Sequence, residues 1–345
     1  MNHSRYPLLM FDAPVNAALN MSSDDAVIEW LLASDPAIRW QVMRDLLHEP
    51  KATYSKERQR IETEGWGAHL RSLQDPDGQW AGGGFAPADI TAKEWKEVGQ
   101  PWTATYSVLQ QLREFGLDPS SDWAQRTVDL VGRNSRWDEG GQPFWEGETE
   151  ECINGQTVAN GSYFGVDMSK LVERLLGERM EDGGWNCERA NGSVRSSFAT
   201  TINVLEGLLE LEKAGRGTPG SVAARKSGEE YLLKRQLFRR LSAGEPADEE
   251  FLRFLHPNRW RYDVLRALDY FRAVGEHTGE KPDARLKEAV EHVRSKRLQD
   301  GKWMLDWDLP GRTWFKVNDG QGKPSQWVTL RAMRCLKWWD ENAEA

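Results

Sequence analysis

The chain has 345 residues, of which 39% are hydrophobic and 29% charged, and its formal net charge is −9. This composition can bury a core and is too apolar for a disordered chain, while the acidic balance and the absence of a Lys/Arg run exclude a general nucleic-acid binder. No apolar stretch approaches about 18 residues, so no transmembrane helix is expected, and three cysteines, an odd and sparse set, favour a cytoplasmic protein without a disulfide framework.

Residues 1–22 are mildly hydrophobic without clear periodicity and lack the long apolar core of a signal peptide, so we treat them as an N-terminal lead-in. From residue 23 onward, two kinds of helical segment alternate. The first kind has a charged face and one apolar stripe, which is typical of solvent-facing outer helices. These segments lie at residues 22–34, 55–73, 121–132, 168–180, 227–240 and 282–298.

The second kind of segment carries less charge and has apolar residues at spacings of three and four, which predicts inner helices. Such segments begin at Trp40, Trp102, Ile153, Phe198, Trp260 and Trp327. Glycines at 116, 165 and 275 are predicted to end three of them. The chain therefore reads as six repeated outer–inner helix pairs with little strand.

Three Asp-Gly turns, each delivering a tryptophan, separate outer from inner segments. They are "LQDPDGQW" (73–80), "RMEDGGWN" (179–186) and "LQDGKWML" (298–305). An Asp-Gly turn stops the outer helix. We expect each tryptophan to pack where the outer helix, the turn and the next inner helix meet, as a structural staple.

These turns resemble the QW repeat of squalene and oxidosqualene cyclases, in which Gln, a short spacer, Gly, any residue and Trp follow one another. The six helix pairs resemble the α/α toroid shared by those cyclases and the β-subunits of protein prenyltransferases. The resemblance implies an all-α fold with a single α/α toroid over residues 23–341. The N-terminal ends of its inner helices would gather at one mouth.

The residues match the chemistry of those families only in part. The Asp-x-Asp-Asp proton donor of squalene-type cyclases is absent from the sequence. Glu150-x-Cys152 is similar in place to the Asp-x-Cys zinc ligands of prenyltransferases, but Ala199 and Thr200 stand where the matching His should lie. Cys187 and His256 could complete a zinc site. The alternative is that no cofactor binds and both cysteines are small, partly buried apolar residues.

Inner-helix N-termini at one mouth would give it positive character and suit a phosphate or carboxylate group. The residues at or just before the starts of these helices, with those of their first turns, supply an aromatic and polar set of candidate substrate-binding residues. They are Arg39, Trp102, Asn154, Arg259, Arg261, Trp327 and Arg331. For acid–base chemistry the candidates are Asp263, Tyr262 and Tyr106, with Asp263 ranked first. A salt bridge from Asp263 to Arg266 or Arg259 is the alternative.

The resemblance and these residues suggest an enzyme acting on a small, anionic or isoprenoid-like organic substrate by acid–base or carbocation chemistry. Cation–π attraction to aromatic faces would support the latter. A ligand-binding or scaffold toroid without catalysis is one alternative, and a carbohydrate-active toroid is another. The partner expected is a small molecule and not a nucleic acid, and the oligomeric state stays open.

Overall fold

The computed structural model describes residues 23–343, so the lead-in predicted at residues 1–22 lies outside the described residues. Within this range the backbone forms helices and turns, with only isolated β-bridges, and the all-α prediction is confirmed. The main helices are α1 (Ser23–Leu32), α2 (Pro36–Gln41), α3 (Lys51–Gln59), α4 (Gly65–Ser72), α5 (Ala92–Val98), α6 (Thr105–Phe115), α7 (Asp122–Asn134), α8 (Glu151–Tyr163), α9 (Ser169–Gly177), α10 (Phe198–Lys213), α11 (Pro219–Leu233), α12 (Val264–Thr278), α13 (Lys287–Ser295) and α14 (Gln326–Asn342). None of the described helices has the length and apolar character needed to cross a bilayer.

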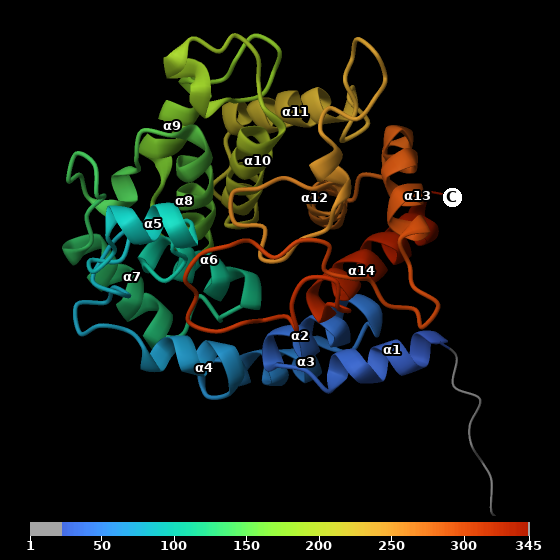
Figure 1. Ribbon diagram of the computed structural model, residues 1–345, viewed down its shortest axis with the longest axis horizontal. Helices are drawn as coiled ribbons and strands as arrows, with labels where there is room; N and C mark the ends of the chain where they lie inside the picture. The colour runs from blue at the N-terminus through green and yellow to red at the C-terminus, as the bar shows by residue number, and fades with distance from the viewer. Residues whose placement is uncertain (1–22, 344–345) are drawn as a thin grey trace, which may run out of the picture.

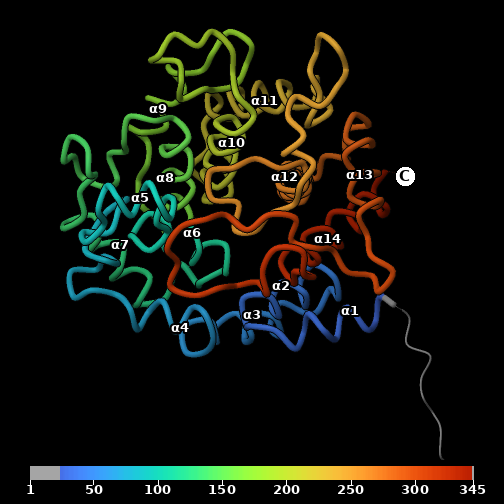
Figure 2. The backbone as a smooth tube through the Cα atoms, in the orientation of Figure 1, coloured from blue at the N-terminus to red at the C-terminus, as the bar shows by residue number. Residues whose placement is uncertain are grey.

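Six helices contact one another in a closed succession. α2 packs on α6, α6 on α8, α8 on α10, α10 on α12, α12 on α14, and α14 returns to α2 (Figure 1). Charged helices pack on the outside of this ring, with α9 against α8, α11 against α10, and α13 against both α12 and α14. The chain path in Figure 2 passes alternately between the two sets. Repeated outer–inner helix pairs predict this succession of contacts between inner helices. Kinship with the cyclase toroid stays a prediction.

The inner helices are buried on nearly all sides, which explains their low charge. Every residue of α8 from Glu151 to Ser162 is buried. α8 and α10 approach most closely at two glycines, because a Cβ on Gly207 would lie 2.3 Å from the carbonyl oxygen of Gly155. Side-chain caps fix where such helices begin, as Ser197 does by accepting from the amide of Thr200 at the start of α10.

The three tryptophans of the Asp-Gly turns are buried side chains that tie each turn to the preceding outer helix. Each indole Nε1 donates to a backbone carbonyl ten residues earlier. The pairs are Trp80 to Leu70, Trp185 to Leu175 and Trp303 to Val293, at 2.7, 2.7 and 2.8 Å. Such a bond satisfies both the indole and a carbonyl near the C-terminal end of the helix.

The same tryptophans also bind the following inner helix. Each backbone amide donates to the Oγ1 atom of a threonine in the first turn of α6, α10 or α14. The pairs are Trp80 to Thr105, Trp185 to Thr201 and Trp303 to Thr329, at 3.2, 3.1 and 3.0 Å. The prediction that these tryptophans are structural staples is confirmed.

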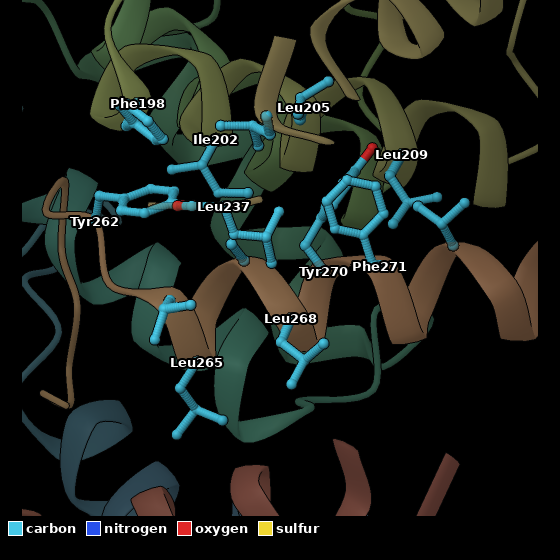
Figure 3. Close-up of a cluster of buried hydrophobic side chains, with 14 of the residues drawn as sticks. Phe198, Ile202, Leu205, Leu209, Leu237, Tyr262, Leu265, Leu268, Tyr270 and Phe271 are labelled. Carbon is cyan, nitrogen blue, oxygen red and sulfur yellow. The ribbon is translucent and has the colours of Figure 1, made fainter. Parts of the chain in front are cut away.

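Buried apolar side chains form two clusters, one centred on α10 and α12 and the other on α2 and α6. Figure 3 shows part of the first cluster, where Phe198 and Ile202 of α10 lie beside Tyr262 and Leu237. The ring centroids of Phe198 and Tyr262 are 5.3 Å apart. These contacts hold α10 against α12.

Several details differ from the sequence predictions. The outer segment at 55–73 is split into α3 and α4, because Gly65 adopts a left-handed backbone with a φ of 64°. Gly275 does not end its helix, since α12 continues to Thr278 and Gly279 is the left-handed cap. Helix α5 was not predicted, because it buries no residue and carries no apolar periodicity.

Candidate functional sites

The N-terminal ends of the inner helices, where the sequence places a ligand, are covered by residues 306–318, which we call the strap (Figure 1). Trp102 donates from its indole Nε1 to the carbonyl of Pro310 at 2.8 Å, and the indole of Trp314 donates to the carbonyl of Thr103 at 2.9 Å. The cavity between the strap and Arg259 measures about 20 Å³, which is room for a single water molecule. Beneath the strap at Arg259 the expected open mouth is therefore filled by the chain itself, while a cavity of about 830 Å³ remains beside the strap at Arg312 and Trp314.

The predicted acid–base residues make structural contacts beneath this covering. Asp263 is the N-cap of α12: its Oδ1 accepts from the amide of Arg266 at 2.6 Å, and its Oδ2 accepts from Asn258 at 2.7 Å. Burial raises the pKa of Asp263 above its ordinary value. Tyr262 donates to the carbonyl of Leu237. Neither residue lines the large cavity described below, and their catalytic assignment stays a prediction.

Tyr106 and three of the predicted substrate-binding residues lie apart from one another. Tyr106 is a core residue packed edge-on against Trp137. Arg39 pairs with Glu57, and Arg261 stacks on the rings of Trp260 and Trp307. The side chain of Asn154 accepts a hydrogen bond from the backbone amide of Glu148 and donates one to its carbonyl. Trp102, Arg259 and Trp327 lie under or beside the strap, and of the predicted set only Arg331 lines the large cavity.

The predicted zinc ligands are brought together with one exception. The ligand atoms of Glu150, Cys152 and Cys187 all lie within 4.8 Å of one another, at the start of α8 and in the turn before α10. Cys152 Sγ is 3.4 Å from Glu150 Oε2, and Cys187 Sγ accepts from Thr200 Oγ1 at 3.4 Å. His256 is not part of this group, because its ring stacks on Trp327.

The two thiols differ in acidity. A hydrogen bond to Cys187 and burial raise the pKa of Cys152 well above its usual range. The same hydrogen bond lowers the pKa of Cys187 to about 7. Two thiolates and a carboxylate are ligands that zinc accepts, and three protein ligands leave a fourth coordination position. The residues present therefore fit a zinc ion.

A charged cavity lies at the opposite end of the ring, at the C-terminal ends of the inner helices. It has a volume of about 710 Å³. Its cationic side chains are Arg44, Arg58, Arg113, Lys213, Arg266, Arg272, Arg331 and Arg334, and its acidic ones are Glu114, Glu206, Glu210, Asp269 and Glu276. Eight cations against five anions give this wall a charge of +3 in a chain whose net charge is −9.

Some of these charges hold the wall together. Arg266 binds Glu206 with two hydrogen bonds of 2.7 Å, and Gln156 donates to the same carboxylate at 2.6 Å. Burial raises the pKa of Glu206, but the charge and hydrogen bonds of Arg266 outweigh it and leave that pKa below its ordinary value. On the other side of the cavity Arg334 binds both oxygens of Asp269. These pairs join α10 to α12 and α12 to α14.

Three cavity arginines have no carboxylate within hydrogen-bonding distance among residues 23–343. Arg113 donates to Gln156 and Asn160, at 2.6 and 2.9 Å. Arg58 donates to two backbone carbonyls and to the hydroxyl of Tyr163. Arg331 approaches a carboxylate no closer than 3.9 Å. The hydrogen-bond partners of all three are neutral groups, so their positive charge is available to a ligand.

The sequence carries a signal for some of the cavity arginines. Arg113 stands three residues before the helix-ending Gly116, and Arg331 and Arg334 lie beyond the first turn of α14. A ligand expected at the N-terminal ends of the inner helices does not predict a role for these positions.

No family model matches the sequence, and no curated protein matches it. Among solved structures, the chain is similar to a crystal structure of a protein from Actinoplanes, with 16% sequence identity and a TM-score of 0.46 over 92% of this chain and 100% of the other.

Proposed function

We propose that this chain binds a small anionic organic molecule in the cavity at the C-terminal ends of its inner helices. The observation that carries the proposal is the set of arginines 58, 113 and 331, which face one cavity without a hydrogen-bonded carboxylate of their own. A guanidinium is a planar fork that matches a carboxylate or a phosphate. The volume of about 710 Å³ suits a small molecule.

The charged and polar side chains of the cavity wall also restrict the chemical class of the ligand. A long hydrocarbon would strip water from the arginines without replacing their hydrogen bonds, which is costly. A ligand with one or two anionic groups and further polar atoms would satisfy them, and would also find the Oγ atom of Ser162, which has no partner among the described residues. We therefore place carboxylated or phosphorylated metabolites ahead of isoprenoid hydrocarbons, and the proposal holds with or without turnover.

Calorimetric titration against matched pairs of ligands tests this function. Each pair contains a carboxylate or phosphate and its neutral amide or alcohol. We expect the anionic members to bind, and Arg113→Met to weaken binding at least tenfold. Arg133→Met is the control, because Arg133 is an exposed residue of α7, with 71% of its side chain accessible, paired with Asp129. Equal binding of the neutral analogues, or full affinity in Arg113→Met, would contradict the proposal.

We further propose a zinc site at Glu150, Cys152 and Cys187, supported by the approach of their ligand atoms to within 4.8 Å. The ion would join the start of α8 to the turn that precedes α10. Metal analysis of the purified protein should find about one zinc per chain, and Co²⁺ substitution should produce a thiolate charge-transfer band. Cys187→Ser should lose both signals and Cys335→Ala, a buried cysteine outside the group, should keep them. Metal content that is the same in both variants would overturn the site.

A further inference from the structure

A cluster of unpartnered hydrogen-bond donors lies inside the ring, between the strap and the large cavity. The indole Nε1 of Trp327, the guanidinium Nε of Arg331 and both ring nitrogens of His256 are buried without a hydrogen-bond partner among residues 23–343. His256 is 2% exposed and Trp327 is 1% exposed. Buried polar atoms are nearly always satisfied, so several such atoms in one place indicate a binding site.

The three residues, which we call the interior donor cluster, are neighbours in space. Trp327 and Arg331 are one turn apart on α14. The ring of His256 stacks on Trp327 with centroids 4.5 Å apart, and Arg331 also binds the side chain of Asn258, two residues beyond His256. The side chain of Asn318, in the strap, donates to the carbonyl of His256 at 2.8 Å and fixes this segment from above.

Two arginines at this cluster have no hydrogen-bonded carboxylate. Arg331 stands 3.9 Å from Asp269, which binds Arg272 and Arg334 instead. Those two arginines have further carboxylate partners in Glu276 and Asp45. Arg259, also buried, binds the amide oxygen of Gln111 through both terminal nitrogens and has no carboxylate within 4 Å among the described residues. Burial lowers the pKa of Arg259 to about 10. An uncompensated buried cation is costly unless an anion binds beside it.

His256 adds a neutral donor to this charged setting. Burial, with the nearby charges of Arg331, Arg259 and Arg334, lowers the pKa of His256 well below its usual range. The neutral imidazole carries a hydrogen on one nitrogen. The small cavity beneath the strap is lined by Pro257 and Asn318, the chain neighbour and the hydrogen-bond partner of His256.

We infer that the interior donor cluster binds a small inorganic anion of halide size, held by the N–H groups of Trp327, Arg331 and His256. A water molecule has two hydrogens of its own to donate, whereas the cluster offers three donors and a single ring nitrogen as acceptor. A halide accepts from all three donors and would lie close to Arg331, which has no hydrogen-bonded carboxylate. This site is separate from the organic ligand proposed for the cavity, although Arg331 borders both.

Bromide locates the anion directly. Crystals of the full chain grown in sodium bromide should give an anomalous scattering peak within hydrogen-bonding distance of Trp327 Nε1 and Arg331 Nε. Bromide found at the protein surface while the interior cluster holds no peak would overturn the inference, and so would water alone at the cluster. The wild-type crystal is sufficient for this test, whether or not the organic ligand of the cavity is ever found.

A measurement of thermal stability in solution is the second test of the anion site. The melting temperature should rise saturably with sodium chloride relative to sodium methanesulfonate, a larger anion that is neither a carboxylate nor a phosphate, at equal ionic strength. Trp327→Phe keeps the ring stacked on His256 and removes one donor, so it should reduce the chloride-specific rise by at least half. Trp95→Phe is the control, because Trp95 is 36% exposed on α5, and it should keep the rise. A rise that is equal in methanesulfonate, or equal in both variants, would show that the cluster binds no specific anion.

Discussion

The indole of Trp185 donates to the carbonyl of Leu175 at 2.7 Å, while the backbone amide of Trp185 donates to the hydroxyl of Thr201. One residue thereby joins outer helix α9 to inner helix α10. The same pair of bonds is made by Trp80 and by Trp303. The repeated turn is thus a device for setting the spacing between two helices.

Trp185→Phe should lower the free energy of unfolding by about 2 to 4 kcal/mol. The substitution leaves the carbonyl of Leu175 buried without its donor and opens space beside it. Urea unfolding followed by circular dichroism measures the loss, with Trp95→Phe as a control expected to change stability by less than about 1 kcal/mol. Equal stability of the two variants would show that the hydrogen bond from the indole of Trp185 does not stabilise the fold.

Gly207→Ala should destabilise the contact between α8 and α10. The added methyl would meet the backbone carbonyl of Gly155 at 2.3 Å, and backbone cannot move aside as a flexible side chain can. We expect a loss of about 2 to 3 kcal/mol by thermal or urea unfolding. Gly177→Ala, where a Cβ has no neighbour within 4 Å among the described residues, should be neutral or slightly stabilising. A neutral Gly207→Ala would mean that the two helices are not held at this distance.

The pair of Arg266 and Glu206 offers a double-mutant cycle. Arg266→Met leaves a buried carboxylate without its partner, and Glu206→Gln leaves a buried guanidinium without a full charge opposite it. Each single variant should lose about 3 kcal/mol, while the double variant should lose less than the sum of the two. Additive losses in unfolding experiments would show that the two side chains do not interact.

Acid should weaken the contact made by Asp45. Burial raises the pKa of Asp45, but the hydrogen bonds and charge of Arg44 and the charge of Arg334 outweigh it and lower that pKa to about 2. Because the folded-state pKa is below the unfolded one, the carboxylate stabilises the fold above about pH 4 and loses this effect as the pH falls towards 2.

Asp45→Asn should therefore be less stable than the wild type at pH 5, with the difference shrinking by on the order of 1 kcal/mol at pH 3. Unfolding by urea at a series of pH values measures both chains. Asp129→Asn, at the exposed ion pair with Arg133, should show no comparable change. A difference that stays constant with pH would contradict the depressed pKa of Asp45.

The helical order of this fold can be read from the sequence, because it depends on periodicity and on turns that act locally. The starts expected at Phe198 and Trp327 lie at α10 and α14. The split at Gly65 could not be read, since a left-handed glycine inside a charged segment looks the same as an exposed helical one. Closure of the ring depends on contacts between α14 and α2, which lie nearly 300 residues apart in the sequence.

The location of the candidate site was harder to predict. The strap and the loop that contains His256 decide which end of the ring stays open. Neither has apolar residues at the regular spacing of a helix or a strand. Glu150 and Cys152 were placed correctly beside Cys187 because all three lie at helix starts or turns on one side of the ring. His256 was misplaced, because its position depends on how a loop packs inside the ring and not on its distance from a helix start.

The return of α14 to α2 also has a consequence for how the chain can be connected. Each inner helix has a neighbour on both sides, so α2 and α14 contact each other as well as the inner helices next to them along the chain. The fold should tolerate circular permutation: residues 23 and 343 could be joined by a flexible linker, and new ends opened in the exposed turn around Gly192, where a side chain would meet no neighbour. The order in which helices leave the ribosome would change, while the assembled ring would keep the same neighbours.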